Sequence, residues 1–128
     1  MKIKNVLAII AILLIIAGIN SDLMAQDALK ALVKKCESAE NVEMNVVRRR
    51  DEKTLKLTRS ITEITIRSNK TLIDEFIVAC EKDEPSAYDI AYSKKDGKMI
   101  PERIRFKSVT FTFSLIKDGL RITMNENY

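Results

Sequence analysis

The chain has no histidine and no tryptophan, and its 128 residues include only three glycines, two prolines and two cysteines. The missing histidines exclude catalytic triads and metal sites that depend on imidazole. Three glycines are too few for a glycine-rich loop around a phosphate. Aromatic residues make up 5% of the chain, which leaves little surface for stacking nucleic-acid bases. We therefore expect no cofactor, no metal site and no nucleic-acid partner.

One long hydrophobic run lies near the N-terminus and is typical of an export signal. Lys2 and Lys4 are followed at positions 6–18 by thirteen residues without a polar side chain, and Ala25 is a small residue at the expected cleavage position. The run is shorter than the about 20 apolar residues that a membrane-spanning helix needs. We predict a signal peptide over residues 1–25 and a periplasmic or secreted protein without a membrane span after cleavage. An uncleaved anchor is the alternative.

Residues 26–128 remain, which is enough for a single small domain. Removing Lys2, Lys4 and Asp22 from the 22 basic and 18 acidic residues leaves 20 and 17, a net charge of +3. This mild, mixed charge differs from the dense positive charge of dedicated nucleic-acid-binding proteins.

Two segments carry apolar residues at helical spacing. The positions are Leu29, Leu32, Val33 and Cys36 in the first segment, and Ile73, Phe76, Ile77 and Cys80 in the second. Gln26 or Asp27 can cap the first helix. Asn69 precedes the second helix, and Thr71 with Asp74 has the spacing of a capping box. The second helix should end at Glu84, because the residue before a proline is pushed out of helical geometry.

Elsewhere apolar and polar residues alternate, as they do in strands of a half-buried sheet. The apolar positions are Val42, Met44, Val46, Tyr88, Ile90, Tyr92, Val109, Phe111, Phe113, Leu115, Leu120, Ile122 and Met124. Asp-Gly pairs at residues 96–97 and 118–119 favour hairpin turns. We predict an α+β fold in which two amphipathic helices pack on one face of a mostly antiparallel meander sheet.

Two further features concern how the strands are organised. Between residues 55 and 66 the apolar positions change from odd to even numbers, which predicts a bulge or a turn near Thr62 and Glu63. The helix-plus-strands pattern also occurs twice, in residues 26–67 and 68–128, with an offset of 44 or 45 residues. A diverged duplication and a coincidence of amphipathic periodicity both explain this similarity.

The second half carries a recognisable pattern. Residues 94–101 form the run KKDGKMIP, followed by IRF at residues 104–106 and FTFSL at residues 111–115. This pattern resembles a family of small exported proteins from Bacteroides-type bacteria that is classed only as a domain of unknown function. The resemblance implies a signal peptide, an amphipathic helix and a similar hairpin, and it implies no catalytic or binding residue.

The two cysteines occupy matching positions on the apolar stripes of the predicted helices. In an exported protein, Cys36 and Cys80 are candidates for a disulfide if the helices lie side by side. The alternative is that both are small core residues, which is common for free cysteine.

Basic residues fall into two groups. Arg48, Arg49, Arg50, Lys53, Lys56 and Arg59 lie around the first predicted hairpin, whereas Arg103, Arg105 and Arg121 share the outward side of the predicted meander. These basic residues, and the second group above all, are a candidate face for an anionic partner such as an acidic polysaccharide, lipid headgroups or an acidic protein. The alternative is a solvated sheet face with edge strands protected by charge.

The sequence offers no convincing catalytic arrangement. Neighbouring carboxylates such as Asp74 and Glu75 point in different directions on a helix, and a small single sheet has little depth for a cleft. We predict a non-enzymatic interaction or binding module with an unidentified envelope or extracellular partner and an open oligomeric state. The alternative is an inhibitor of an exported enzyme. It ranks second because the predicted hairpin tips, at residues 49–52, 95–97 and 117–119, carry no apolar anchor.

Overall fold

The computed structural model describes residues 27–128, so the predicted signal peptide lies outside the described residues. The elements in chain order are α2 (Asp27–Cys36), β1 (Val42–Arg50), β2 (Leu57–Arg67), α3 (Lys70–Asp83), the 3-10 helix η1 (Glu84–Ser86), β3 (Asp89–Lys95), β4 (Lys98–Arg105), β5 (Val109–Ile116) and β6 (Gly119–Asn127). The described residues thus form an α+β fold with two α-helices, as the sequence predicts, and the structure gives six strands.

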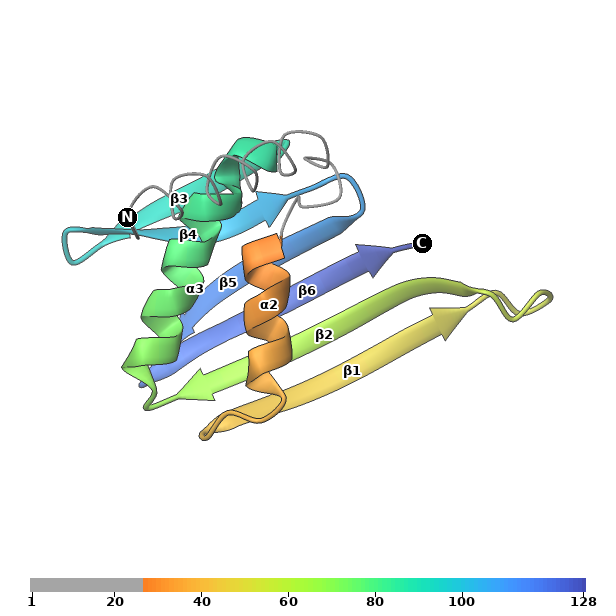
Figure 1. The fold of residues 1–128 in the computed structure, drawn as a ribbon, viewed down its shortest axis with the longest axis horizontal. Helices are drawn as coiled ribbons and strands as arrows, with labels where there is room; N and C mark the ends of the chain where they lie inside the picture. The colour runs from red at the N-terminus through yellow and green to blue at the C-terminus, as the bar shows by residue number, and fades with distance from the viewer. Residues whose placement is uncertain (1–26) are drawn as a thin grey trace, which may run out of the picture.

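All six strands belong to one sheet, in the order β1-β2-β6-β5-β4-β3, and every pairing is antiparallel. Strands β3 to β6 form the predicted meander, in which each strand pairs with the next. The β1–β2 hairpin joins this meander through pairing of β2 with β6. Strands β1 and β3 are therefore the two edges of the sheet (Figure 1).

The two helices run antiparallel and side by side in front of the sheet (Figure 1). Their buried residues, including Leu29 and Phe76, belong to the same hydrophobic cluster as Ile64, Phe111 and Ile122 of the strands. The rings of Phe106 and Phe111 meet edge to face with centroids 6.1 Å apart. The hydrophobic core therefore lies between this helix pair and one side of the sheet.

The helix ends follow from local chemistry in one helix and from tertiary contacts in the other. Asn69 caps α3 by accepting a hydrogen bond from the Leu72 backbone N–H at 3.2 Å, so the cap precedes the capping box predicted at Thr71 and Asp74. The helix ends at Asp83, and Pro85 lies in the 3-10 helix that follows, as expected from the sequence. The first N–H groups of α2 are held instead by the side chain of Asp83.

The predicted bulge or turn near Thr62 and Glu63 is wrong. Strand β2 runs unbroken through these residues, and the register shift lies further out, between Arg49 and Arg50 of β1. The sequence pattern misleads because Ile61 points to the opposite side of the sheet from Ile64 and is only half-buried there. An isoleucine on the polar face imitates a change of strand parity.

The two halves are arranged alike, although the duplication itself stays a prediction. In each half a helix is followed by a hairpin whose first strand, β1 or β3, lies at an edge of the sheet. The second strand of each hairpin, β2 or β4, then pairs inward with β6 or β5.

Candidate functional site

The β1–β2 hairpin projects beyond the rest of the sheet (Figure 1). Strand β6 pairs with β2 only from Arg59 to Arg67, so the part of the hairpin nearer its tip has no neighbour among the other described strands. All side chains from residue 45 to residue 56 are exposed. We call residues 46–59 the projecting hairpin; Arg59 at its base still pairs with Asn127 of β6. Both of its faces are open to solvent, because the helix pair covers only the other end of β1 and β2.

The tip of the projecting hairpin is fixed by its own hydrogen bonds. The Asp51 carboxylate accepts from the backbone N–H groups of Lys53 and Thr54, at 2.8 and 2.9 Å, and these bonds lower the pKa of Asp51. The Asp51 carbonyl accepts from the Leu55 N–H at 2.8 Å. The Arg50 guanidinium donates to the Leu55 carbonyl at 3.1 Å. The loop is therefore preorganised rather than loosely attached.

This loop displays an apolar side chain that the sequence reasoning missed. Leu55 has a positive φ of 60° and its side chain is 66% exposed. The structure thus corrects the expectation that no hairpin tip carries an apolar anchor. The sequence predicts the tip at residues 49–52 and gives no signal for an apolar tip residue, because Leu55 continues the apolar alternation toward Leu57. A positive φ at a non-glycine residue is uncommon and often marks a functional loop.

The projecting hairpin carries a cluster of basic side chains outside the ion pairs of the described residues, as are exposed lysines elsewhere such as Lys94, Lys95 and Lys98. Its basic residues are Arg48, Arg49, Arg50, Lys53, Lys56 and Arg59, and its acidic residues are Asp51 and Glu52, which gives a net charge of +4. Within residues 27–128, none of these six basic groups lies within ion-pair distance of a carboxylate. A potential of one sign therefore surrounds this part of the molecule.

The basic residues that the sequence predicts as a partner face have acidic neighbours. Arg103 and Arg105 both contact Asp89, with nitrogen–oxygen distances of 3.4 and 3.7 Å, and Arg121 contacts Glu63 at 3.6 Å. All three alternate with buried neighbours and so lie on the side of the sheet away from the core. Arg103 and Arg105 lie together on β4, whereas Arg121 lies on β6 beyond β5. This face therefore presents mixed charge rather than a purely basic patch.

Cys36 and Cys80 are buried and free in the structure. Burial raises the pKa of Cys36 to about 11 and that of Cys80 to about 12. The helices run antiparallel, with Lys35 against Glu75 at one end and Leu29 against Asp83 at the other. At 1.5 Å per residue the cysteines are offset by about 7 Å along the axes, before the helix separation is added. A disulfide would need the backbone to move, and the bridge stays a prediction.

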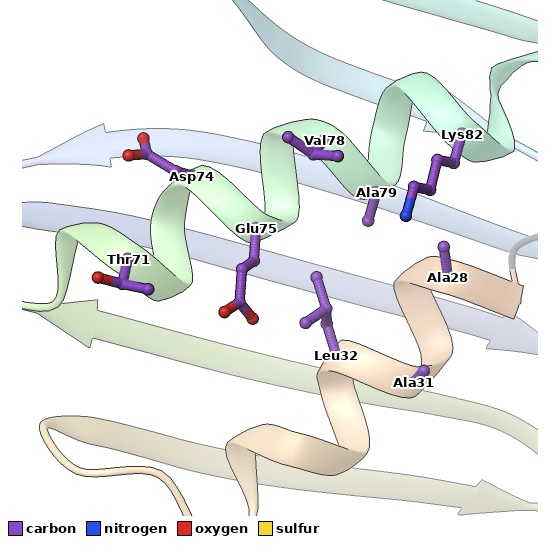
Figure 2. Close-up of a pocket in the computed structure, with 9 residues that line it drawn as sticks. All are labelled: Ala28, Ala31, Leu32, Thr71, Asp74, Glu75, Val78, Ala79 and Lys82. Atoms are coloured by element: carbon purple, nitrogen blue, oxygen red, sulfur yellow. The ribbon is translucent and has the colours of Figure 1, made fainter.

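A groove of about 600 Å³ runs between the two helices on their outer side. Figure 2 shows the small side chains Ala28, Ala31 and Ala79 along it. Its carboxylates, Asp74 and Glu75, both come from α3, and Glu75 is held by Lys35 at 2.9 Å. The groove therefore lacks two carboxylates facing each other across a cleft, which glycoside hydrolysis requires.

A second, smaller hollow of about 280 Å³ lies between β4 and β5. These strands pair only from Arg103 to Arg105, and Pro101, which has no N–H, lies where they separate. Across residues 27–128, no three cysteine, aspartate or glutamate side chains cluster as metal ligands. No helix in the described part of the chain is long and apolar enough to cross a membrane.

Comparison with known protein families matches residues 26–128 to a domain of unknown function (DUF5024). The chain belongs to the DUF5024 family. The predicted membership of a family of unknown function is therefore confirmed over the whole domain, and the bacterial origin stays a prediction. No curated protein and no solved structure matches the chain. Functional residues of this DUF5024 domain thus have to be inferred from its own geometry.

Proposed function

We propose that this DUF5024 domain is a small exported, non-enzymatic binding module that engages an anionic partner through the projecting hairpin. The observation that carries the proposal is the cluster of six basic side chains without carboxylate partners on a ribbon exposed on both faces. An acidic neighbour lowers the local positive potential that an anionic partner meets, and the basic side chains of the hairpin have no described carboxylate within ion-pair distance.

Export is supported by the order of the N-terminal segments. A cationic start, a thirteen-residue apolar run and Ala25 precede the domain, and the family match begins at Gln26. We place the mature protein in the periplasm or outside the cell of a Bacteroides-type bacterium. Its partner would then be an envelope or extracellular molecule rather than a nucleic acid.

Export can be tested by the mass of the processed protein. The full chain, expressed in a bacterial host, should be recovered from the periplasm or medium with its N-terminus at Gln26 or within about two residues of it. Retention of Met1 in the exported material would contradict this part of the proposal.

The binding site can be tested with two matched triple variants. The hairpin triple variant carries Arg48→Gln, Lys53→Gln and Lys56→Gln, and the sheet triple variant carries Arg103→Gln, Arg105→Gln and Arg121→Gln. Dextran sulfate serves as a soluble polyanion, and calorimetry gives the dissociation constant. We expect the hairpin triple variant to bind at least about tenfold more weakly, and the sheet triple variant to change by about twofold or less. Equal losses in both variants would refute the assignment to the hairpin.

A second candidate function is inhibition of an exported enzyme. Leu55 favours it, because an exposed apolar side chain on a preorganised loop is the kind of anchor that fills an active-site pocket. The test is titration of purified protein against secreted proteases and glycosidases. Inhibition that Leu55→Gly abolishes would support this function, and inhibition that Leu55→Gly leaves unchanged would count against the hairpin.

The non-enzymatic part of the proposal rests on the arrangement of the reactive side chains. Among residues 27–128 the core holds two buried thiols, and burial raises the pKa of both. A thiol with a raised pKa is a poor nucleophile at neutral pH. The carboxylates of the groove lie on a single helix. Turnover of generic ester, glycoside or phosphate substrates by purified protein would overturn this part.

A further inference from the structure

We propose that the anionic partner of the projecting hairpin is the headgroup layer of an anionic phospholipid bilayer, into which Leu55 inserts. This inference rests on the proposed function and narrows it to one class of partner. Three observations carry it: the distribution of charge over both faces of the hairpin, the apolar side chains among those charges, and the length of the hairpin.

Charge and apolar surface surround the hairpin instead of occupying one face. In β1, Val46, Arg48 and Arg50 point to one side, and Val47 and Arg49 point to the other. Val46 and Val47 are 45% and 54% exposed and lie about 10–13 Å before Arg50 along the strand, on the protein side of the headgroup layer. A flat protein surface could cover only one of these faces. A layer of lipid headgroups surrounds an inserted ribbon and can offer phosphates to both faces at once.

The order of apolar and basic side chains from the tip to the base of the hairpin matches the order of layers in a bilayer. Leu55 lies at the tip, and Arg50, Lys53 and Lys56 lie within the same loop or beside it. Strands rise about 3.3 Å per residue, so Arg48 to Arg50 lie within about 10 Å of the tip. The polar region of each leaflet is about 5–8 Å thick. Leu55 can therefore reach the hydrocarbon boundary while the basic side chains remain among the phosphates.

The base of the hairpin carries a further side chain suited to this environment. Tyr128 is 65% exposed, and its backbone N–H donates to the Thr58 carbonyl at 3.0 Å, which fixes it beside the hairpin. Tyrosine is enriched where membranes meet water, because its ring is apolar and its hydroxyl is polar. A surface of this composition, with arginine, leucine and tyrosine together, fits an anionic interface better than a soluble polyanion.

The first experiment measures cosedimentation with lipid vesicles. Protein lacking the signal peptide should bind vesicles of phosphatidylcholine with about 30% phosphatidylglycerol, and should not bind pure phosphatidylcholine. The hairpin triple variant should lose about fivefold in affinity for each charge removed, the equivalent of about 1 kcal/mol. The sheet triple variant should lose about twofold or less, because its charges lie beyond a Debye length of the vesicle surface. Unchanged urea midpoints would show that both variants fold.

The second experiment follows Leu55. Because the chain has no tryptophan, Leu55→Trp places a single tryptophan at the tip, and excitation beyond the tyrosine absorption band avoids the three tyrosines. The tryptophan emission should shift to shorter wavelength with anionic vesicles and stay unchanged with dextran sulfate. Leu55→Gly should weaken vesicle binding about five- to tenfold without harming the fold, since glycine adopts a positive φ readily.

The outcomes separate this inference from the proposed function. If dextran sulfate binds as well as the vesicles do, and Leu55 contributes to neither, the lipid assignment is overturned while the anionic-partner function stands. If the hairpin triple variant binds both probes as the wild type does, both proposals are wrong.

Discussion

Replacement of Asp83 should loosen the N-terminal helix, although this residue lies 54 positions away from the backbone group that it holds. Its carboxylate accepts hydrogen bonds from the Ala28 N–H at 3.3 Å and from the Leu29 N–H at 2.9 Å, and the residue is only 7% exposed. An acidic residue at the C-terminal end of α3 thus serves as the N-terminal cap of α2. This contact fixes how the two antiparallel helices meet.

The magnitude follows from what Asp83→Ala removes. Loss of an N-terminal cap costs about 1 kcal/mol, and a buried N–H left without an acceptor costs about 1–3 kcal/mol. Alanine also removes the free-energy cost of burying a charged carboxylate, a cost that shows in the raised pKa of Asp83. This gain offsets part of the loss. We therefore expect a net loss of about 2 kcal/mol in the free energy of unfolding. Glu81→Ala is the matched control on the same helix, and it should change stability by less than about 0.5 kcal/mol.

Urea unfolding monitored by circular dichroism gives the free energies, and hydrogen exchange shows where the structure loosens. The amides of α2 should lose protection in Asp83→Ala and keep it in Glu81→Ala. An unfolding free energy for Asp83→Ala within about 0.5 kcal/mol of the wild type would refute the proposed role of this cap.

The pH dependence of the same contact has a definite sign. Burial raises the pKa of Asp83 in the folded state, so the folded protein binds this proton more tightly than the unfolded chain does. The stabilising contribution of the proton is complete below the unfolded pKa and is lost as the pH rises through the folded pKa. Relative to Asp83→Asn, the wild type should therefore gain stability as the pH falls from neutral toward about 4. A gain in the opposite direction would mean that the hydrogen bonds outweigh desolvation.

The remaining predictions concern the sheet and the thiols. Gly119→Ala should cost about 3 kcal/mol because the new methyl group would overlap the Ile66 carbonyl, whereas Gly97→Ala, at a positive φ of 78° in open space, should cost about 1 kcal/mol. Phe111→Ala should cost about 3–5 kcal/mol, and Thr112→Ala at its exposed neighbour less than about 0.5 kcal/mol. Urea melts measure all four variants. Equal effects within either pair would refute the assigned packing. Both cysteines should resist alkylation in the native protein and react after denaturation, and a mass lower by two hydrogens would restore the disulfide instead.

The local structure of this protein could be predicted because it depends on neighbours a few positions apart. The helical stripe ending at Cys80, the proline after α3 and the two Asp-Gly turns act over two to five residues. The alternation of Phe111 with Thr112 likewise assigns each side chain to a face of the sheet. Ile61 marks the limit of such reasoning, because an apolar residue on the polar face looks the same as a bulge.

The candidate site depended on contacts between distant segments. Whether a basic side chain is paired is decided by the strand register, which brings Asp89 to Arg103 and Glu63 to Arg121 and leaves the basic side chains of the projecting hairpin outside ion-pair distance of any described carboxylate. The exposure of Leu55 follows from β2 extending past the end of β6, a difference in strand length that appears only when the two strands pair.

The sequence by itself determined the helices, strands and turns and the burial of most side chains. The spacing of apolar residues follows the geometry of a single helix or strand, so these features can be read locally. The tertiary structure decided the antiparallel direction of the helices, which offsets the two cysteines and brings Asp83 to the start of α2. It also decided the insertion of β6 between β2 and β5. These choices depend on which arrangement buries the core side chains of both halves together, and no short stretch of sequence contains that information.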